Sequence, residues 1–119
     1  MNEPRDARAA VREAFEAVEV VARLIAPNYK NLNGTMVRKE LLQAAVAAFP
    51  GDPIQELKGW PTQFEAFAVW VDGMHNYRHG QPGGRAPTEE FAVLILTTGG
   101  GYLRLLCDMF ARQHPPAGP

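Results

Sequence analysis

Residues 91–110 read FAVLILTTGGGYLRLLCDMF, and this stretch decides the fold class. Its apolar side chains recur every three or four residues, as on a helix that buries one face. The stripe consists of Phe91, Leu94, Ile95, Thr98, Tyr102, Leu105, Leu106 and Met109. The glycines at 99–101 cost about 3 kcal/mol of helix propensity relative to alanine. Because the stripe keeps its phase across them, we expect one helix from the N-cap Thr88 to about Arg112, with a β-strand over 91–98 as the alternative.

Three more helices are predicted in the chain that precedes this stretch. They cover residues 4–26, 35–49 and about 62–77. Each shows the same helical spacing of apolar residues, and each is followed by a segment rich in Pro, Gly or Asn. Thr35 is expected to be the N-cap of the second helix. Thr62 is expected to open the third, with Glu65 completing a Thr-x-x-Glu capping box.

The predicted fold is all-α: an up-and-down four-helix bundle in one domain over residues 1–112, followed by a disordered tail over residues 113–119. Eleven glycines and ten prolines are many for a helical protein, but most of them fall at predicted helix ends and connections. Only Gly73 and Gly99–Gly101 lie inside helical segments. We expect these glycines to let two helix backbones approach each other closely.

The charge balance and the cysteine content exclude several classes of protein. Twelve Lys and Arg against thirteen Asp and Glu give a net charge of -1, so the large basic excess of many nucleic-acid-binding domains is missing. No window has the roughly 18 uncharged apolar residues of a membrane span, and the N-terminal segment carries acids, unlike a secretory signal. A cytoplasmic location without membrane attachment is therefore expected. The single cysteine, Cys107, excludes a disulfide within this sequence.

The densest polar cluster is MHNYRHG at residues 74–80, where the third helix is predicted to end. The imidazoles of His75 and His79 can exchange protons near neutral pH, and Arg78 can stabilise a negatively charged phosphate. These are the catalytic groups that a metal-independent ribonuclease requires. The alternative is structural, since His and Arg near a helix C-terminus also bond its last carbonyls. No metal site is expected, because the two histidines would need at least one further ligand.

Further residues are candidates for contacts with RNA or phosphate. Arg78, Arg85 and Lys39 carry the positive charge that binds phosphate, and Tyr77 offers a ring on which a base can stack. Trp60 is another candidate for stacking, although its place beside Pro61 also suits a core residue. No cofactor is expected, because the glycine-rich segments match neither a phosphate loop nor a dinucleotide fingerprint.

The layout of these segments resembles the small HEPN-like helical domains of bacterial abortive-infection and toxin-antitoxin proteins. The resemblance covers most of residues 7–112 and rests on Glu19, Arg78-His79-Gly80 and the Glu90-x-Ala92 pattern that opens the last helix. It implies a dimeric all-α bundle, in a family with many metal-independent ribonucleases. Catalytic members carry an arginine followed four to six residues later by a histidine. Arg78 and His79 are adjacent here, which favours a relative that binds RNA, nucleotide or a partner protein.

Three functions are compatible with these residues. The first is a HEPN-like domain of a bacterial defence or toxin-antitoxin system that binds RNA, nucleotide or a cognate partner protein near His75, Arg78 and His79. The second is a metal-independent ribonuclease in which a histidine is general acid and base and Arg78 stabilises the developing charge. The third is a purely structural dimerisation module. A homodimer is expected because one small core would leave apolar border residues uncovered. These residues are Trp70, Val46 and Tyr102.

Overall fold

The computed structural model describes residues 4–52, 58–79 and 88–115, which form four helical rods. The first rod is α1 (Pro4–Ile25). The second is built from α2 (Gly34–Met36), the π-helical turn η1 (Val37–Leu41) and α3 (Leu42–Ala48). The third and fourth are α5 (Gly59–His79) and α6 (Glu89–Gln113). These residues contain no strand, so the all-α prediction is confirmed for the described part of the chain.

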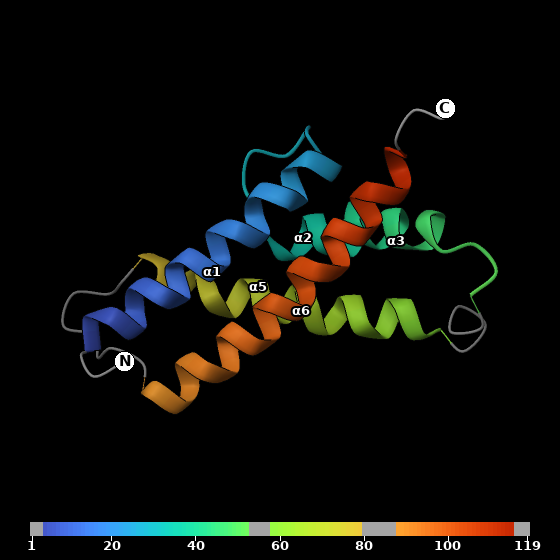
Figure 1. The fold of residues 1–119 in the computed structure, drawn as a ribbon. Coiled ribbons are helices and arrows are strands. Elements are labelled where there is room, and N and C mark those ends of the chain that lie inside the picture. Colours follow the sequence, from blue (N-terminus) through green and yellow to red (C-terminus); the bar gives the residue numbers. More distant parts are fainter. Residues whose placement is uncertain (1–3, 53–57, 80–87, 116–119) are drawn as a thin grey trace.

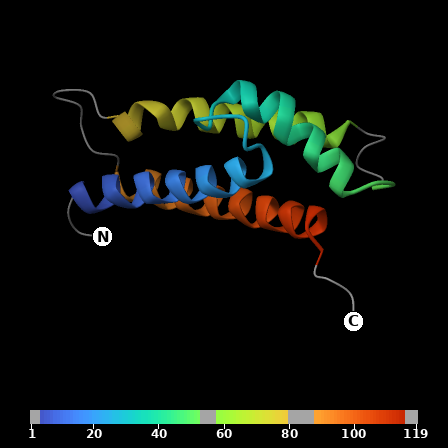
Figure 2. The same cartoon turned by 90° about the horizontal axis from the view of Figure 1, so that it is seen from above.

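The four rods pack in two layers (Figures 1 and 2). The helices α1 and α6 lie side by side and run in the same direction, while the second rod and α5 form the other layer. The helix α5 runs opposite to α6. A four-helix bundle is therefore present, but the predicted up-and-down order is wrong at its first connection, because the second rod runs in the same direction as α1.

The connection between α1 and the second rod explains this direction. The backbone N–H of Leu32 donates a hydrogen bond of 3.0 Å to Oε2 of Glu19, thirteen residues earlier in the chain. The side chain of Leu32 is buried in the core. Both contacts draw the connection back along α1, so that α2 begins beside that helix and not beyond its end. Helical periodicity carries no information about such a contact.

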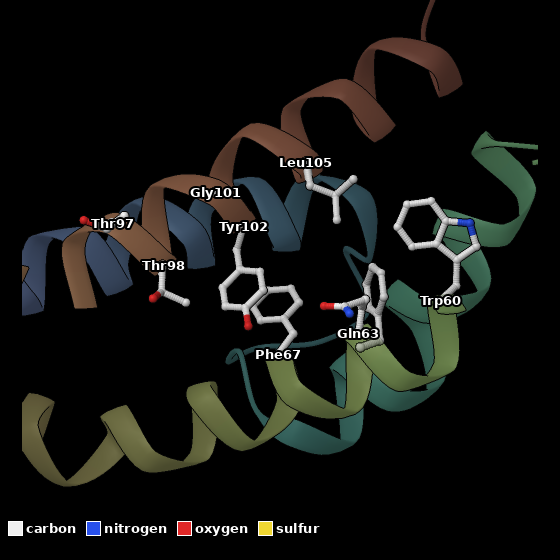
Figure 3. A pocket seen from close by; sticks show the side chains of 9 residues that line it. Trp60, Gln63, Phe67, Thr97, Thr98, Gly101, Tyr102 and Leu105 are labelled. Atoms are coloured by element: carbon white, nitrogen blue, oxygen red, sulfur yellow. The ribbon is translucent and has the colours of Figure 1, made fainter. Parts of the chain in front are cut away.

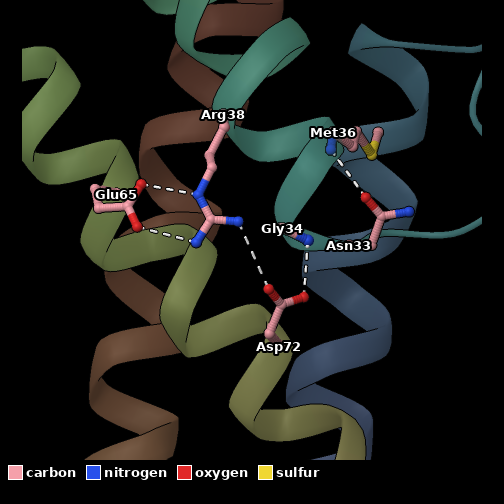
Figure 4. A network of polar contacts seen from close by, with 6 residues as sticks. All are labelled: Asn33, Gly34, Met36, Arg38, Glu65 and Asp72. Atoms are coloured by element: carbon pink, nitrogen blue, oxygen red, sulfur yellow. Dashed lines mark hydrogen bonds and ion pairs between the residues drawn. The ribbon is translucent and has the colours of Figure 1, made fainter.

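A polar network holds the start of the second rod on α5 (Figure 4). Oδ1 of Asn33 accepts a hydrogen bond of 2.9 Å from the backbone N–H of Met36, so Asn33 is the N-cap and the prediction of Thr35 is wrong. Oδ1 of Asp72 accepts a second bond of 2.9 Å from the backbone N–H of Gly34. A Cβ atom on Gly34 would overlap the Asp72 carboxylate, so a larger residue here would have to displace that side chain.

Arg38, in η1, joins the same network. Its guanidinium donates two hydrogen bonds to the Glu65 carboxylate, from Nε at 2.8 Å and from Nη2 at 2.9 Å. Its Nη1 lies 3.8 Å from Oδ2 of Asp72. The hydrogen bonds lower the pKa of Glu65 and raise the pKa of Arg38. Glu65 therefore binds Arg38 of the second rod and does not form the capping box with Thr62 that the sequence predicts.

The helix α5 begins earlier than predicted, at Gly59, and Thr62 is not its N-cap. The hydroxyl of Thr62 instead donates to the carbonyl of Lys58 at 3.1 Å. Pro61 is tolerated in this first turn, because the N–H that proline lacks has no intrahelical partner there. Trp60 anchors the turn by stacking on Phe49, with 5.3 Å between the ring centroids.

The helix α6 is continuous through its three glycines, as predicted, and the alternative of a strand is wrong. Its N-cap is Thr88, as predicted, whose Oγ1 accepts a hydrogen bond of 3.2 Å from the backbone N–H of Phe91. The helix ends at Gln113, so the first residue assigned to the tail is helical. Leu94 was expected in the buried stripe but is 61% exposed.

The glycines of α6 do not pair with Gly73, contrary to the prediction. Gly99 is buried, and a Cβ atom there would lie 3.2 Å from Cζ2 of the Trp70 indole. Gly73, Gly100 and Gly101 are exposed, and a Cβ atom on any of them would have no other described residue within 4 Å. Gly99 alone among these four serves a close approach, and its neighbour is an indole ring, not a second backbone.

The hydrophobic core fills the space between the two layers. Its largest fully buried side chains are Phe15, Phe64, Phe67, Met36, Leu41, Leu106, Met109, Val18, Val37 and Val71. Two of the three predicted border residues, Trp70 and Tyr102, pack on Phe67 with ring centroids 6.3 and 4.1 Å away. Val46 is 40% exposed. Trp70 and Tyr102 are thus partly buried within the chain, whereas Val46 is exposed.

Candidate functional site

The residues predicted as catalytic lie at the end of α5. His75 is exposed there, and the helix continues through positions 78 and 79. The side chains of Tyr77, Arg78 and His79 lie outside the described residues. The predicted ribonuclease site is thus described for His75 and for the helical backbone only.

The phosphate-binding candidates beyond this helix are placed in part. Lys39 is exposed on η1, in the same turn as Arg38 of the polar network. Arg85 lies outside the described residues. Among the residues that the structure describes, no group of three or more His, Cys, Asp and Glu is arranged to hold a metal ion.

An open pocket of about 340 Å³ lies between α5 and α6 (Figure 3). The residues that line it come from these two helices: Trp60, Gln63, Phe64, Phe67, Thr97, Thr98, Gly101, Tyr102 and Leu105. Figure 3 shows Tyr102 reaching from α6 toward Phe67 on α5, with Thr97 and Thr98 on one side and Leu105 and Trp60 on the other. The pocket therefore joins two helices that are separate in the sequence.

Aromatic rings form the floor of this pocket. Trp60, Phe64 and Phe67 follow each other at spacings of four and three residues, which puts them on one face of α5. Trp60 meets Phe64 edge to face at 6.1 Å, and Phe64 meets Phe67 in the same way at 5.8 Å. The ring of Tyr102 stacks on Phe67 at 4.1 Å with 15° between their planes. The rings hold one another in place before any ligand binds.

The polar groups of the pocket are neutral. Gln63 and Thr97 are exposed at its edge. The hydroxyl of Thr98 donates to the carbonyl of Leu94 at 2.8 Å, so its hydrogen is used within α6 while its lone pairs stay available. Burial raises the pKa of Tyr102, which therefore keeps its proton at neutral pH. The described lining can stack on a ligand and exchange hydrogen bonds with it, but it presents no charge.

Periodicity alone could not identify this pocket. The sequence marks Trp60 as a candidate for stacking, but Phe64, Phe67 and Tyr102 have the spacing of ordinary core residues. A stripe that is half core and half pocket looks the same in the sequence as one that is entirely core. The one available signal was the aromatic content of this segment, the highest along the chain.

Comparison of the chain with protein-family models, with curated protein sequences and with solved structures gives no match. The HEPN-like resemblance therefore stays a prediction, together with the cytoplasmic location.

Proposed function

We propose that the chain is a ligand-binding helical module, and that the pocket between α5 and α6 takes an uncharged organic molecule with a flat apolar face. One observation carries this proposal. Four aromatic side chains from two helices meet in one pocket, and its described lining includes no charged side chain. The volume of about 340 Å³ falls within the range of small-molecule sites, which starts near 300 Å³.

The class of ligand follows from the lining. A flat ring system can stack on Trp60 or Tyr102, and each aromatic pair of this kind adds about 0.5–1.5 kcal/mol beyond the apolar area it buries. Gln63 supplies both an amide donor and an acceptor, and Thr97 a hydroxyl, so a ligand with one or two neutral polar groups would be oriented. A phosphate or carboxylate would find no cation among the described lining residues and would lose its hydration on entry.

The pocket supports binding and not catalysis. Tyr102 is the one titratable group among its described lining residues, and its raised pKa leaves the phenol neutral at pH 7. A neutral phenol can donate a hydrogen bond but is neither a general base nor a nucleophile at that pH. The ligand is therefore expected to leave the pocket unchanged.

A neutral probe tests the pocket directly. N-phenyl-1-naphthylamine, whose fluorescence rises in apolar surroundings, should bind saturably to the wild-type chain. Thr98→Phe puts a ring into the pocket from the α6 side and should weaken binding at least about tenfold, or roughly 1.4 kcal/mol. Val69→Phe, on the exposed side of α5, is the matched control and should leave the affinity unchanged. Equal affinity of Thr98→Phe and wild type would reject this site.

We also propose a second function, binding of RNA or nucleotide at the end of α5, as expected of a HEPN-like defence or toxin-antitoxin domain. The supporting observation is that α5 stays helical to His79. Positions three and four residues apart share one side of a helix, so position 75 lies on the same side as positions 78 and 79. A histidine can thereby stand beside Arg78 even though Arg78 and His79 are adjacent in the sequence.

Labelled RNA tests this second function. We expect a mobility shift that weakens steeply with salt and that is reduced at least fivefold in Arg78→Ala and His79→Ala. Arg23→Ala, which removes a charge from the last turn of α1, is the control and should bind as wild type does. Incubation of RNA with the protein in EDTA tests the ribonuclease alternative. Cleavage by the wild type that is lost in His79→Ala would show that the site is catalytic. Absence of any shift would leave the pocket as the proposed site.

A further inference from the structure

The solvent face of α6 is unusually poor in charge. Between Phe91 and Leu103 the sequence has thirteen residues without a charged side chain. On the side turned away from the core, Val93 is 52% exposed and Leu94 is 61% exposed. Thr97, Gly100 and Gly101 continue this face, and Glu90 and Arg104 flank it, all of them exposed. These seven residues are called the outer seam of α6, and they recur every three or four residues as a helix-packing surface does.

Packing within the described part of the chain does not require the two exposed glycines of the seam to be glycine. A Cβ atom on Gly100 or Gly101 would meet nothing within 4 Å, whereas one on Gly99 would press on Trp70. Glycine inside a helix is destabilising relative to alanine, and no turn or positive φ is needed here. Small residues on an exposed helix face allow a second helix backbone to approach closely.

We propose that the outer seam binds the outer seam of a second copy of this chain, with the two α6 helices antiparallel and the twofold axis at Thr97. In this register Leu94 faces the partner's Gly100, and Val93 faces the partner's Gly101. Glu90 then faces the partner's Arg104, and Thr97 faces the partner's Thr97. The twofold symmetry repeats each contact. Val93 and Leu94 of each copy therefore pack over the two glycines of the other, and an ion pair forms at both ends of the interface.

Charge and size both select this arrangement over a parallel one. Parallel helices in register would place Glu90 beside the partner's Glu90 and Arg104 beside the partner's Arg104. They would also set glycine against glycine and leave a gap that no side chain fills. In the antiparallel register every seam residue except Thr97, which meets its own copy on the twofold axis, faces a residue of complementary charge or size. Because Thr97 and Gly101 also line the pocket, the partner's Val93 comes to its rim.

A membrane is the competing occupant of this face. By length and composition α6 could cross a bilayer, with a mean hydropathy of 1.3 over an 18-residue window of which 22% is buried. The uncharged stretch from Phe91 to Leu103, however, spans only about 20 Å as a helix, against a bilayer core of about 30 Å. The other side of this stretch, with Ala92, Ile95 and Gly99, is buried within the bundle. These facts favour a second copy over a lipid.

Sedimentation equilibrium between about 1 and 100 μM tests the proposal. We expect a reversible dimer, weakened at least tenfold by Glu90→Arg and by Arg104→Glu, each of which sets like charges against each other. An equimolar mixture of these two variants should form a heterodimer with wild-type affinity, because opposite charges then face each other at both ends. At one end the pair is the wild-type one, and at the other end the two charges have exchanged places. Glu16→Arg is the control for Glu90→Arg. It makes the same change of charge at an exposed position of α1 and should leave the dimer intact.

The seam has a steric test as well. Gly101→Leu should weaken the dimer at least a hundredfold, since the partner's Val93 loses its space. The same substitution at Gly73 should not affect it, because Gly73 is equally open but lies on α5. A chain that stays monomeric up to 100 μM would overturn the proposal. So would a dimer that none of the seam variants weakens, or a monomer that binds vesicles of phosphatidylcholine and loses that binding in Leu94→Arg.

Discussion

Replacing Phe67 by alanine is expected to lower the free energy of unfolding by about 3–5 kcal/mol. Phe67 is 1% exposed and lies at the centre of the aromatic cluster, with Phe64, Trp70 and Tyr102 around it at centroid distances of 5.8, 6.3 and 4.1 Å. Truncation removes the ring and leaves a cavity that three large neighbours cannot close without leaving their rotamers.

Urea denaturation followed by tryptophan fluorescence measures this loss. Because a domain of this kind has a total stability of about 5–15 kcal/mol, Phe67→Ala should shift the midpoint strongly or unfold the chain. Val69→Ala, two residues along α5 and 59% exposed in the wild type, is the control and should stay within about 0.5 kcal/mol. A loss below 1 kcal/mol for Phe67→Ala would contradict the packing described for α5 and α6. The same variant should also bind N-phenyl-1-naphthylamine more weakly, since Phe67 lines the pocket.

Replacing Gly99 by leucine is expected to destabilise the chain by about 3 kcal/mol, through overpacking. A Cβ atom at this position would lie 3.2 Å from Cζ2 of Trp70 and 3.8 Å from Cβ of Ala14, so a leucine side chain would have to push these neighbours aside. The indole would have to move away from the stack that it forms on Phe15, at 6.3 Å between centroids. The helix propensity gained by removing a glycine, about 1 kcal/mol, is too small to offset this.

Thermal denaturation followed by circular dichroism measures the Tm of the variants and distinguishes a buried glycine from an exposed one. A loss of 3 kcal/mol lowers Tm by roughly 10 °C or more in a domain of this size. Gly73→Leu is the matched control on α5, where a Cβ atom meets nothing within 4 Å, and it should raise Tm slightly through helix propensity. If both variants had the same Tm, Gly99 would not be in the tight contact with Trp70 that the structure shows.

The sequence predicted the helices well because their signals are local. A stripe of apolar residues with period 3.6 requires only the residues of one segment, and it correctly indicated that α6 passes through Gly99–Gly101 without a break. The Thr88 N-cap was predictable for the same reason, since a cap bonds an amide three residues away. Thr62 shows the limit, because a local capping pattern was overridden by Trp60, which packs on Phe49 and lengthens α5 by a turn.

The candidate sites divide in the same way. The cluster at His75, Arg78 and His79 is a local pattern, and the sequence alone proposes it. The pocket and the outer seam could not be predicted from a local sequence pattern, because both depend on which side of α6 faces the core. Leu94 has the period of a buried residue and yet is exposed, while Tyr102, predicted at the border, stacks on Phe67.

By itself, then, the sequence determined the all-α class, the approximate extent of each helix and the continuity of the last one, because hydrogen bonds and apolar periodicity within a helix depend on near neighbours. Only the tertiary structure decided the direction of the second rod, the pairing of Arg38 with Glu65 and the separate roles of the three adjacent glycines. Each of these depends on contacts between residues far apart in the chain, such as Leu32 with Glu19 and Gly99 with Trp70. Packing between helices chooses among arrangements that are equally compatible with the local pattern, and for this reason it could not be predicted from that pattern.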